Sequence, residues 1–112
     1  MSSLRALALL TALTLAPASA MAAPEESVAG VTYVFTAVDA YTAGAGHLVI
    51  TGVLQGESTP RTIFFDAPAY DGSEANRCDR LALLAMTRPG RFHFSWFKEY
   101  PGAYPTCTLT RQ

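Results

Sequence analysis

Few side chains in this chain are suited to chemistry. The sequence of 112 residues has two histidines, His47 and His93, and two cysteines, Cys78 and Cys107. The cysteines are too far apart for a Cys-X-X-Cys redox pair, and these four residues do not have the ligand spacing of a zinc site. The sequence also carries no glycine-rich phosphate loop and no serine or cysteine nucleophile motif. We therefore predict no metal ion and no cofactor, and we assign no catalytic residue.

One histidine still has to be weighed as a catalytic base. His93 alternates with aromatic residues in the run RFHFSWF. An imidazole can act as a general base, and together with an acid such as Asp66 it would make the protein a small hydrolase. A histidine on the polar face of a half-exposed strand needs no such role, and this simpler interpretation is favoured. His47, at the start of another predicted strand, has the same interpretation.

A loop rich in aromatic residues is the most suggestive feature for binding. The segment WFKEYPGAYP, from Trp96 to Pro105, places Phe97, Tyr100 and Tyr104 beside charged residues. Rigid rings with polar tips give a large contact area at low entropic cost, so they are common in binding sites. The same rings would also serve as a cover over an open barrel end or a long hairpin, and the sequence leaves both interpretations open. The candidate ligand-binding residues are His93, Phe97, Lys98, Tyr100 and Tyr104.

Five strands and one helix would position this loop. Runs of β-branched and aromatic residues predict strands over residues 31–38, 47–56, 61–67, 91–97 and 106–111. Gly52, inside the second strand, indicates a bulge or a sharp bend. The helix is predicted over residues 74–87 and is ended by Pro89-Gly90. Its buried stripe, at spacings of three and four residues, consists of Cys78, Leu81, Ala82, Ala85 and Met86.

Three strands, a helix and two strands are also the element order of the OB fold, a small and partly open five-stranded barrel. The run CDRLALLAMTRPGRFHFSW, followed later by CTLTR, resembles a pattern in small exported bacterial proteins of unknown function. Its layout is similar to the binding subunits of AB-type bacterial toxins, in which a helix followed by a strand carries one end of a disulfide. No receptor-binding residue of those toxins matches a position here. The resemblance implies a mainly β protein of the α+β class with an OB-like barrel; the alternative is a five-stranded antiparallel sheet with one packed helix.

The N-terminus has the order of a secretory signal peptide. Residues 1–20 read MSSLRALALLTALTLAPASA, with a positive charge at Arg5, then an apolar run, then small residues. The apolar run of about a dozen residues is shorter than the roughly 20 that a membrane-spanning helix needs. We predict cleavage after residue 20, or as late as residue 23, followed by a flexible leader over 24–30 and one domain over 31–112. The mature protein is expected to be periplasmic or secreted, without a membrane span.

Export gives the two cysteines a role. In an oxidising compartment, two cysteines in a small domain usually form one disulfide. A bridge between Cys78 and Cys107 would join the start of the predicted helix to the last predicted strand. It would close a loop of 30 residues, which corresponds to about 3.5 kcal/mol of stabilisation in the chain-entropy model.

Composition narrows the function classes. The chain has eight basic and nine acidic residues and a net charge of −1, so it lacks the basic excess of a nucleic-acid-binding protein. We expect an exported, non-enzymatic binding module whose ligand is a saccharide or a protein. The alternative is a structural, interaction or inhibitor protein of the cell envelope, and a small hydrolase ranks third. The sequence does not predict an oligomeric state.

Overall fold

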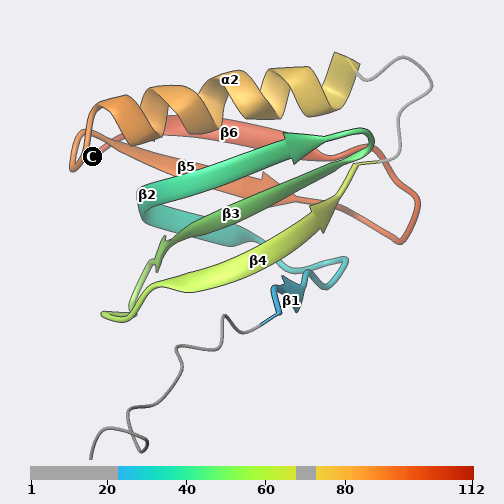
Figure 1. Cartoon of the computed structure of the whole chain (residues 1–112), viewed down its shortest axis with the longest axis horizontal. Helices are drawn as coiled ribbons and strands as arrows, with labels where there is room; N and C mark the ends of the chain where they lie inside the picture. Colours follow the sequence, from blue (N-terminus) through green and yellow to red (C-terminus); the bar gives the residue numbers. More distant parts are fainter. Residues whose placement is uncertain (1–22, 68–72) are drawn as a thin grey trace, which may run out of the picture.

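A computed structural model of the chain describes residues 23–67 and 73–112, with the backbone alone for residues 73–76 (Figure 1). The predicted signal peptide, residues 1–20, lies outside this part of the chain. The predicted order of three strands, a helix and two strands is confirmed, and a short strand precedes them. In chain order the elements are β1 (Glu25–Glu26), β2 (Tyr33–Gly44), β3 (His47–Leu54), β4 (Arg61–Asp66), α2 (Ser73–Thr87), β5 (Phe92–Phe97) and β6 (Thr106–Arg111).

The strands form one open sheet in the order β1-β4-β3-β2-β5-β6. Strand β1 is parallel to β4, and all other neighbours are antiparallel. The protein is therefore of the α+β class, with a six-stranded mixed sheet and one helix in the described part. The expected five-stranded barrel is wrong in strand number and in closure, and the five-stranded antiparallel alternative lacks β1.

The N-terminal segment explains why the barrel is not closed. Glu25 and Glu26 pair with Ile63 and Phe64 along the outer edge of β4, which is the edge that a closing strand would need. The backbone N–H of Ser27 continues this contact by donating to the Phe64 carbonyl at 3.0 Å. Residues 24–30, predicted as a flexible leader, therefore contain a strand of the sheet.

Strand β2 bends the sheet. Its pairing with β3 shifts register twice, between Phe35 and Ala37 and again between Val38 and Ala40, and such bulges increase strand twist. Gly52 lies opposite Val38, and a β-carbon there would collide with the carbonyl oxygen of Ala37. The bend predicted at Gly52 is therefore confirmed, and its physical cause is a backbone approach that only glycine allows.

The bend brings the concave face of the sheet together as the core. Phe65 on β4 and Trp96 on β5 are separated in the sheet by β3 and β2, yet their ring centroids are 4.8 Å apart. Phe65 also contacts Tyr33 and Phe35 edge-on, at 5.3 and 6.1 Å between centroids. Trp96 is fully buried in this cluster, so it is a core residue and not part of a binding loop.

Helix α2 runs along the curled sheet and packs over β2, β5 and β6 (Figure 1). Cys78, Ala82 and Ala85 are its buried residues, and their small side chains let the helix lie close to the strands. Leu81 packs partly against the core, whereas Met86 is 38% exposed and leaves the predicted buried stripe. Within the residues that the structure describes, no helix is long and apolar enough to span a membrane.

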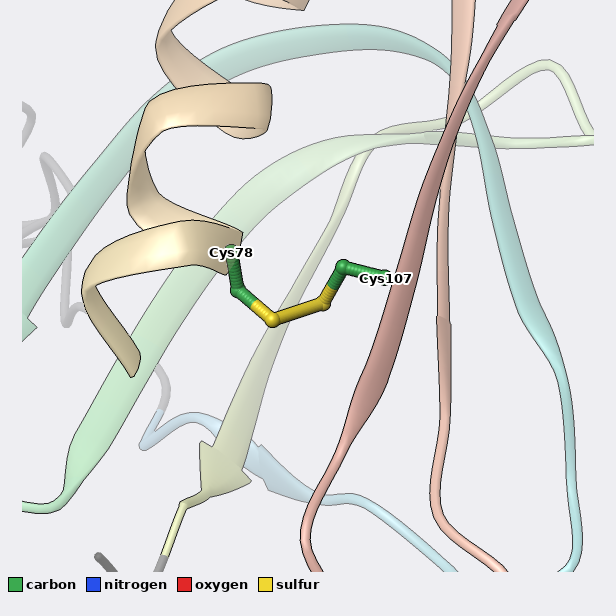
Figure 2. Close-up of a disulfide and its surroundings, with 2 residues drawn as sticks. All are labelled: Cys78 and Cys107. Carbon is green, nitrogen blue, oxygen red and sulfur yellow. A yellow bond between two sulfur atoms is a disulfide. The ribbon is translucent and has the colours of Figure 1, made fainter. Parts of the chain in front are cut away.

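The predicted disulfide between Cys78 and Cys107 is confirmed (Figure 2). The two Cα atoms are 5.4 Å apart, within the range of about 4.4–6.8 Å that the bond allows. Cys78 lies on the buried face of α2, and Cys107 lies near the start of the edge strand β6. The bond therefore attaches the helix to a strand that has only one neighbour in the sheet, and it indicates an oxidising, extracytoplasmic compartment.

Removing the bond tests its share of the stability. We expect the double variant Cys78→Ala/Cys107→Ala to unfold with a free energy lower by about 2–5 kcal/mol, because the unfolded chain regains the freedom of a 30-residue loop. Urea melts of the oxidised protein and the variant measure the difference. Reduced wild-type protein is the control and should match the variant. Equal stability of oxidised and reduced protein would contradict this role.

Candidate functional site

The loop between β5 and β6 presents two tyrosines to solvent. Tyr100, Pro101, Gly102 and Ala103 form a tight turn, in which the Ala103 N–H donates to the Tyr100 carbonyl at 3.0 Å. Proline at the second position sets φ, and glycine at the third adopts a φ of 87°, which is the pattern of a type II turn. Tyr100 is 61% exposed and Tyr104 is 52% exposed. These two rings are therefore not a cover over the core.

The sequence predicted Lys98 as a ligand-binding residue, but in the structure Lys98 is a buried structural residue. It is 8% exposed, and its Nζ donates to the carbonyl of Asp66 at 2.9 Å. The same Nζ lies 3.7 Å from Oδ2 of Asp66, and the Lys98 carbonyl accepts the N–H of Gly30 at 2.6 Å. Lys98 thus joins the ends of β4 and β5 to the N-terminal segment, and it has no free charge to offer a ligand.

Of the other two candidates, Phe97 lies at the loop and His93 does not. Both are half-buried on the convex face of β5, opposite Thr106 and Thr110 of β6. At the usual rise of a strand the two residues are about 13 Å apart. His93 therefore lies nearer the other end of the hairpin, and in the described part of the chain it has no hydrogen bond to a carboxylate that would support hydrolysis.

A small hollow lies beside the tyrosine loop. It measures ≈ 190 Å³, which is below the roughly 300–1,000 Å³ of typical small-molecule pockets. Its walls come from the N-terminal segment, the end of β4 and the loop: Glu26, Ser27, Val28, Ala29, Asp66, Trp96, Lys98, Pro101 and Gly102. This hollow is therefore too small to enclose a ligand of ordinary size.

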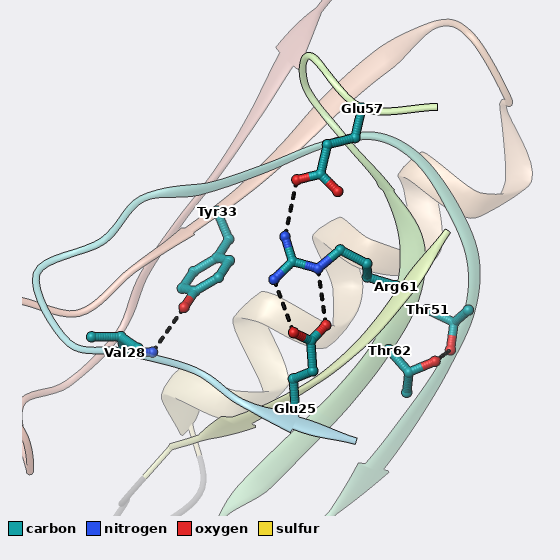
Figure 3. Close-up of polar contacts among 7 residues, drawn as sticks. All are labelled: Glu25, Val28, Tyr33, Thr51, Glu57, Arg61 and Thr62. Atoms are coloured by element: carbon teal, nitrogen blue, oxygen red, sulfur yellow. Dashed lines mark hydrogen bonds and ion pairs between the residues drawn. The ribbon is translucent and has the colours of Figure 1, made fainter. Parts of the chain in front are cut away.

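Sequence reasoning missed a polar cluster that anchors the N-terminal segment (Figure 3). Arg61 binds both carboxylate oxygens of Glu25, at 2.9 and 3.1 Å, and one oxygen of Glu57 at 2.9 Å. Nearby, the N–H of Val28 donates to the hydroxyl of Tyr33 at 2.8 Å. The only available signal was the opposite charge of Arg61 and Glu25, which are 36 positions apart.

These contacts shift the ionisation of the cluster. The hydrogen bond from Arg61 lowers the pKa of Glu25, although the carboxylate is exposed. The hydrogen bond to Glu25 likewise raises the pKa of Arg61, which keeps the guanidinium charged. Both groups are occupied with each other, so this cluster holds β1 in place and has no reactive group.

A second ionisable pair lies between the helix and the sheet. Burial raises the pKa of Tyr41 on β2, and the nearby carboxylate of Asp79 on α2 raises it further. Oxygen Oδ1 of Asp79 is buried without a hydrogen-bond partner. This pair keeps the Tyr41 hydroxyl protonated under the helix, where no hollow of the described structure reaches it.

The turn between β2 and β3 lies at the same end of the sheet as the tyrosine loop. The Ala67 N–H donates to the Gly46 carbonyl at 2.8 Å, and His47 pairs with Asp66, which also contacts Lys98. On the convex face the His47 imidazole stacks on Phe64, with centroids 5.3 Å apart and ring planes 19° apart. Two further rings are thus available near this end.

Metal chemistry and known relatives give no further guide. Within residues 23–67 and 73–112, no three histidine, cysteine, aspartate or glutamate side chains gather in a way that could hold a metal ion. Comparison with models of protein families, with curated proteins and with solved structures finds no match. Function must therefore be argued from the geometry.

The Arg61 cluster predicts a pH dependence of stability. Because the folded state lowers the pKa of Glu25, the pairing stabilises the fold above the unfolded pKa of about 4.3 and is lost as pH falls through the folded pKa. In Arg61→Gln the pKa of Glu25 should return toward its ordinary value, and less stability should be lost on acidification. Carbon-13 NMR of the carboxyl groups and urea melts at neutral and acidic pH measure the two effects.

Glu57→Gln is the matched control for this experiment. It removes the negative charge of the other partner of Arg61 and leaves the bidentate pair with Glu25 intact. It should therefore keep the lowered pKa of Glu25. An unchanged pKa of Glu25 in Arg61→Gln would show that the pair does not form in solution.

Proposed function

We propose that this protein is an exported, non-enzymatic binding module that captures its ligand with the tyrosine loop. One observation carries the proposal: Tyr100 and Tyr104 are both more than half exposed on a loop that a type II turn holds in shape. Exposed aromatic rings on a shaped loop lose little side-chain entropy when they bind. In contrast, the described part contains no arrangement of His93 with an acid that would favour the hydrolase.

The order of the elements supports the position of the site. In an OB fold, the loops between the first two and the last two strands of the barrel bind oligosaccharides and oligonucleotides. We take the curled sheet as an open relative of that arrangement, in which the β2–β3 turn and the tyrosine loop are the corresponding loops. They lie at the same end of the sheet, where Lys98, the basic residue of the tyrosine loop, is buried against Asp66. A saccharide is thus a better ligand for this end than a nucleic acid.

A saccharide also suits the chemistry of the loop. The C–H faces of a sugar ring are apolar and pack on aromatic rings, while the tyrosine hydroxyls can exchange hydrogen bonds with sugar hydroxyls. Such binding needs no deep pocket, which agrees with the small hollow beside the loop. The small size of this hollow favours a chain of sugars that lies across the surface over a single buried sugar.

The interaction-protein alternative has its own supporting observation. Leu83 and Leu84 are nearly half exposed on the outer face of α2, away from the tyrosine loop. Neighbouring exposed leucines are common in protein-protein contacts. A protein of the cell envelope that docks on the helix would therefore use this face, and variants of the two surfaces separate the two functions.

The tyrosine loop is tested with Tyr100→Ala/Tyr104→Ala. Because both rings are exposed, the free energy of unfolding should change by less than about 0.5 kcal/mol in a urea melt. Binding on a glycan array should weaken at least about tenfold, since aromatic contacts at the centre of an interface often contribute 2 kcal/mol or more. Leu83→Ala/Leu84→Ala is the matched control and should bind glycans like the wild type.

Three results would contradict the saccharide proposal. The first is a large loss of stability in the tyrosine variant, which would make the rings part of the core. The second is glycan binding that survives without the tyrosines. The third is a combination of two findings: no glycan on the array binds, and the protein captures one envelope protein. If only Leu83→Ala/Leu84→Ala abolishes this capture, the result would support the interaction-protein alternative.

Export is part of the proposal and has a separate test. The order of charge, apolar run and small residues in positions 1–20 supports it, and so does the disulfide. The intact mass of protein from the periplasm or the medium should correspond to a chain that begins between Met21 and Pro24. A mass that includes Met1 to Ala20 would exclude a cleaved signal peptide.

A further inference from the structure

The end of the β5–β6 hairpin opposite the tyrosine loop gathers three arginines. Arg91 immediately precedes β5, Arg111 ends β6, and Arg111 pairs with Phe92 across the hairpin. Arg88 follows the last residue of α2 and reaches the same place through a turn, in which the Arg91 N–H donates to the Arg88 carbonyl at 3.1 Å. In Figure 1 the C-terminal end of the chain lies beside this end of the helix.

The arginines surround a hollow. It has a volume of ≈ 350 Å³, and its lining residues are Arg88, Gly90, Arg91, Phe92, Arg111 and Gln112. Gln112 is anchored on one side of it: its Nε2 donates to the carbonyls of Thr36 and Phe92 at 2.9 and 3.0 Å, and its N–H donates to the Arg91 carbonyl at 2.9 Å. The backbone around the hollow is therefore set by hydrogen bonds before any ligand arrives.

These arginines have no carboxylate partners in the described part of the chain. The ion pairs found there belong to Arg61 and Lys98. Of their carboxylate partners, Glu25 lies on β1, Glu57 lies in the turn before β4, and Asp66 ends β4. The acidic partners are therefore at the other edge of the sheet. None of the three arginines of the hollow is therefore neutralised by an ion pair with a carboxylate among the described residues.

The helix explains only one of the three charges. A cation just past the C-terminus of a helix is stabilised by the partial negative charge of the last carbonyls, and Arg88 has this position. Arg91 and Arg111 belong to the strand hairpin and not to the helix, yet they line the same hollow as Arg88. Three like charges around one hollow repel each other, and this repulsion would be relieved by an anion bound between them.

We propose that this hollow binds a phosphate or sulfate group. A guanidinium offers two parallel N–H donors that match two oxygens of such a group, and three guanidinium groups from separate elements can surround a tetrahedral oxyanion with two negative charges. A single carboxylate has only one charge and two oxygens to offer. The site is separate from the tyrosine loop, because the length of the hairpin lies between them.

The test uses the mature protein with any purification tag at its N-terminus, since a tag after Gln112 would lie beside the hollow. Pyrophosphate is the soluble probe, and isothermal titration calorimetry at low salt measures its binding. We expect saturable binding at one site, with affinity reduced about tenfold or more in Arg91→Gln and in Arg111→Gln, because each substitution removes charge-assisted hydrogen bonds.

Arg77→Gln is the matched control. It removes the same charge from an exposed position on α2, about 16 Å along the helix from Arg88 at the usual rise. It should bind pyrophosphate within about twofold of the wild type, since screening weakens charges at more than about 10 Å. Thermal melts of all three variants should match the wild type, because the residues are exposed.

Vesicles distinguish a lipid headgroup from a soluble ligand. Cosedimentation with phosphatidylglycerol vesicles, and none with phosphatidylcholine vesicles, would assign the phosphate to a lipid if Arg91→Gln and Arg111→Gln abolish it. Pyrophosphate binding without vesicle binding would assign it to a soluble compound. The proposal is overturned if neither probe binds, or if Arg77→Gln weakens binding as much as the hollow variants, since the effect would then be diffuse attraction.

Tyr100→Ala/Tyr104→Ala separates this site from the proposed glycan site. It should bind pyrophosphate or phosphatidylglycerol vesicles like the wild type, even if no glycan is ever found. If this variant loses anion binding while it stays folded, the two ends do not act as independent sites, and the proposal as stated is wrong.

Discussion

The contact between Phe65 and Trp96 is the constraint on which the rest of the structure depends. The two rings come from strands that are not neighbours in the sheet, so they meet only because the sheet curls. The curl in turn needs the two bulges of β2 and the glycine opposite them, where the strands approach too closely for a side chain. Once the rings are in contact, the ends of β4 and β5 are close enough for Lys98 to join them, and the tyrosine loop takes its place beside that junction.

The N-terminal segment covers part of a sheet edge that the curl leaves unpaired. A sheet that curls without closing has two edges, and unpaired edges invite association with other chains. Strand β1 covers part of the β4 edge, and the segment after it donates to Tyr33 and Lys98. The other edge, β6, is attached to the helix by the disulfide. Each edge is therefore protected by a contact that is remote in sequence, one polar and one covalent.

Patterns of residue type in the sequence predicted five of the strands and the helix. They did not predict contacts that are made by backbone groups alone. Alternation identified β5, with Phe94 and Trp96 inside, and Gly52 marked the bend, because both depend on side-chain size. Strand β1 was missed because its two glutamates have no strand pattern and their pairing uses the backbone alone. Closure of the barrel was predicted wrongly for the same reason.

At the candidate site, the sequence identified the loop, but the burial of Lys98 depends on a carbonyl 32 positions away, which no local pattern contains. The exposure of the tyrosines follows from a turn that the Pro-Gly pair does indicate, although only the fold shows which way the rings lie.

The β5–β6 hairpin connects the two proposed sites, and its stability decides how well each is formed. Its first strand, β5, contributes the buried rings of Phe94 and Trp96 to the core, which fixes the hairpin on the sheet. Its two ends are held in different ways. The arginine end is held by hydrogen bonds of Gln112 to neighbouring carbonyls, whereas Cys107, three residues after Tyr104, is held by the bond to α2. The disulfide thus restrains the strand that leaves the tyrosine loop, which lowers the entropy that the loop would lose on binding. In a reducing compartment the tyrosine end would lose this restraint and the arginine end would keep its hydrogen bonds. Export would therefore matter more for the function of one end than for the other.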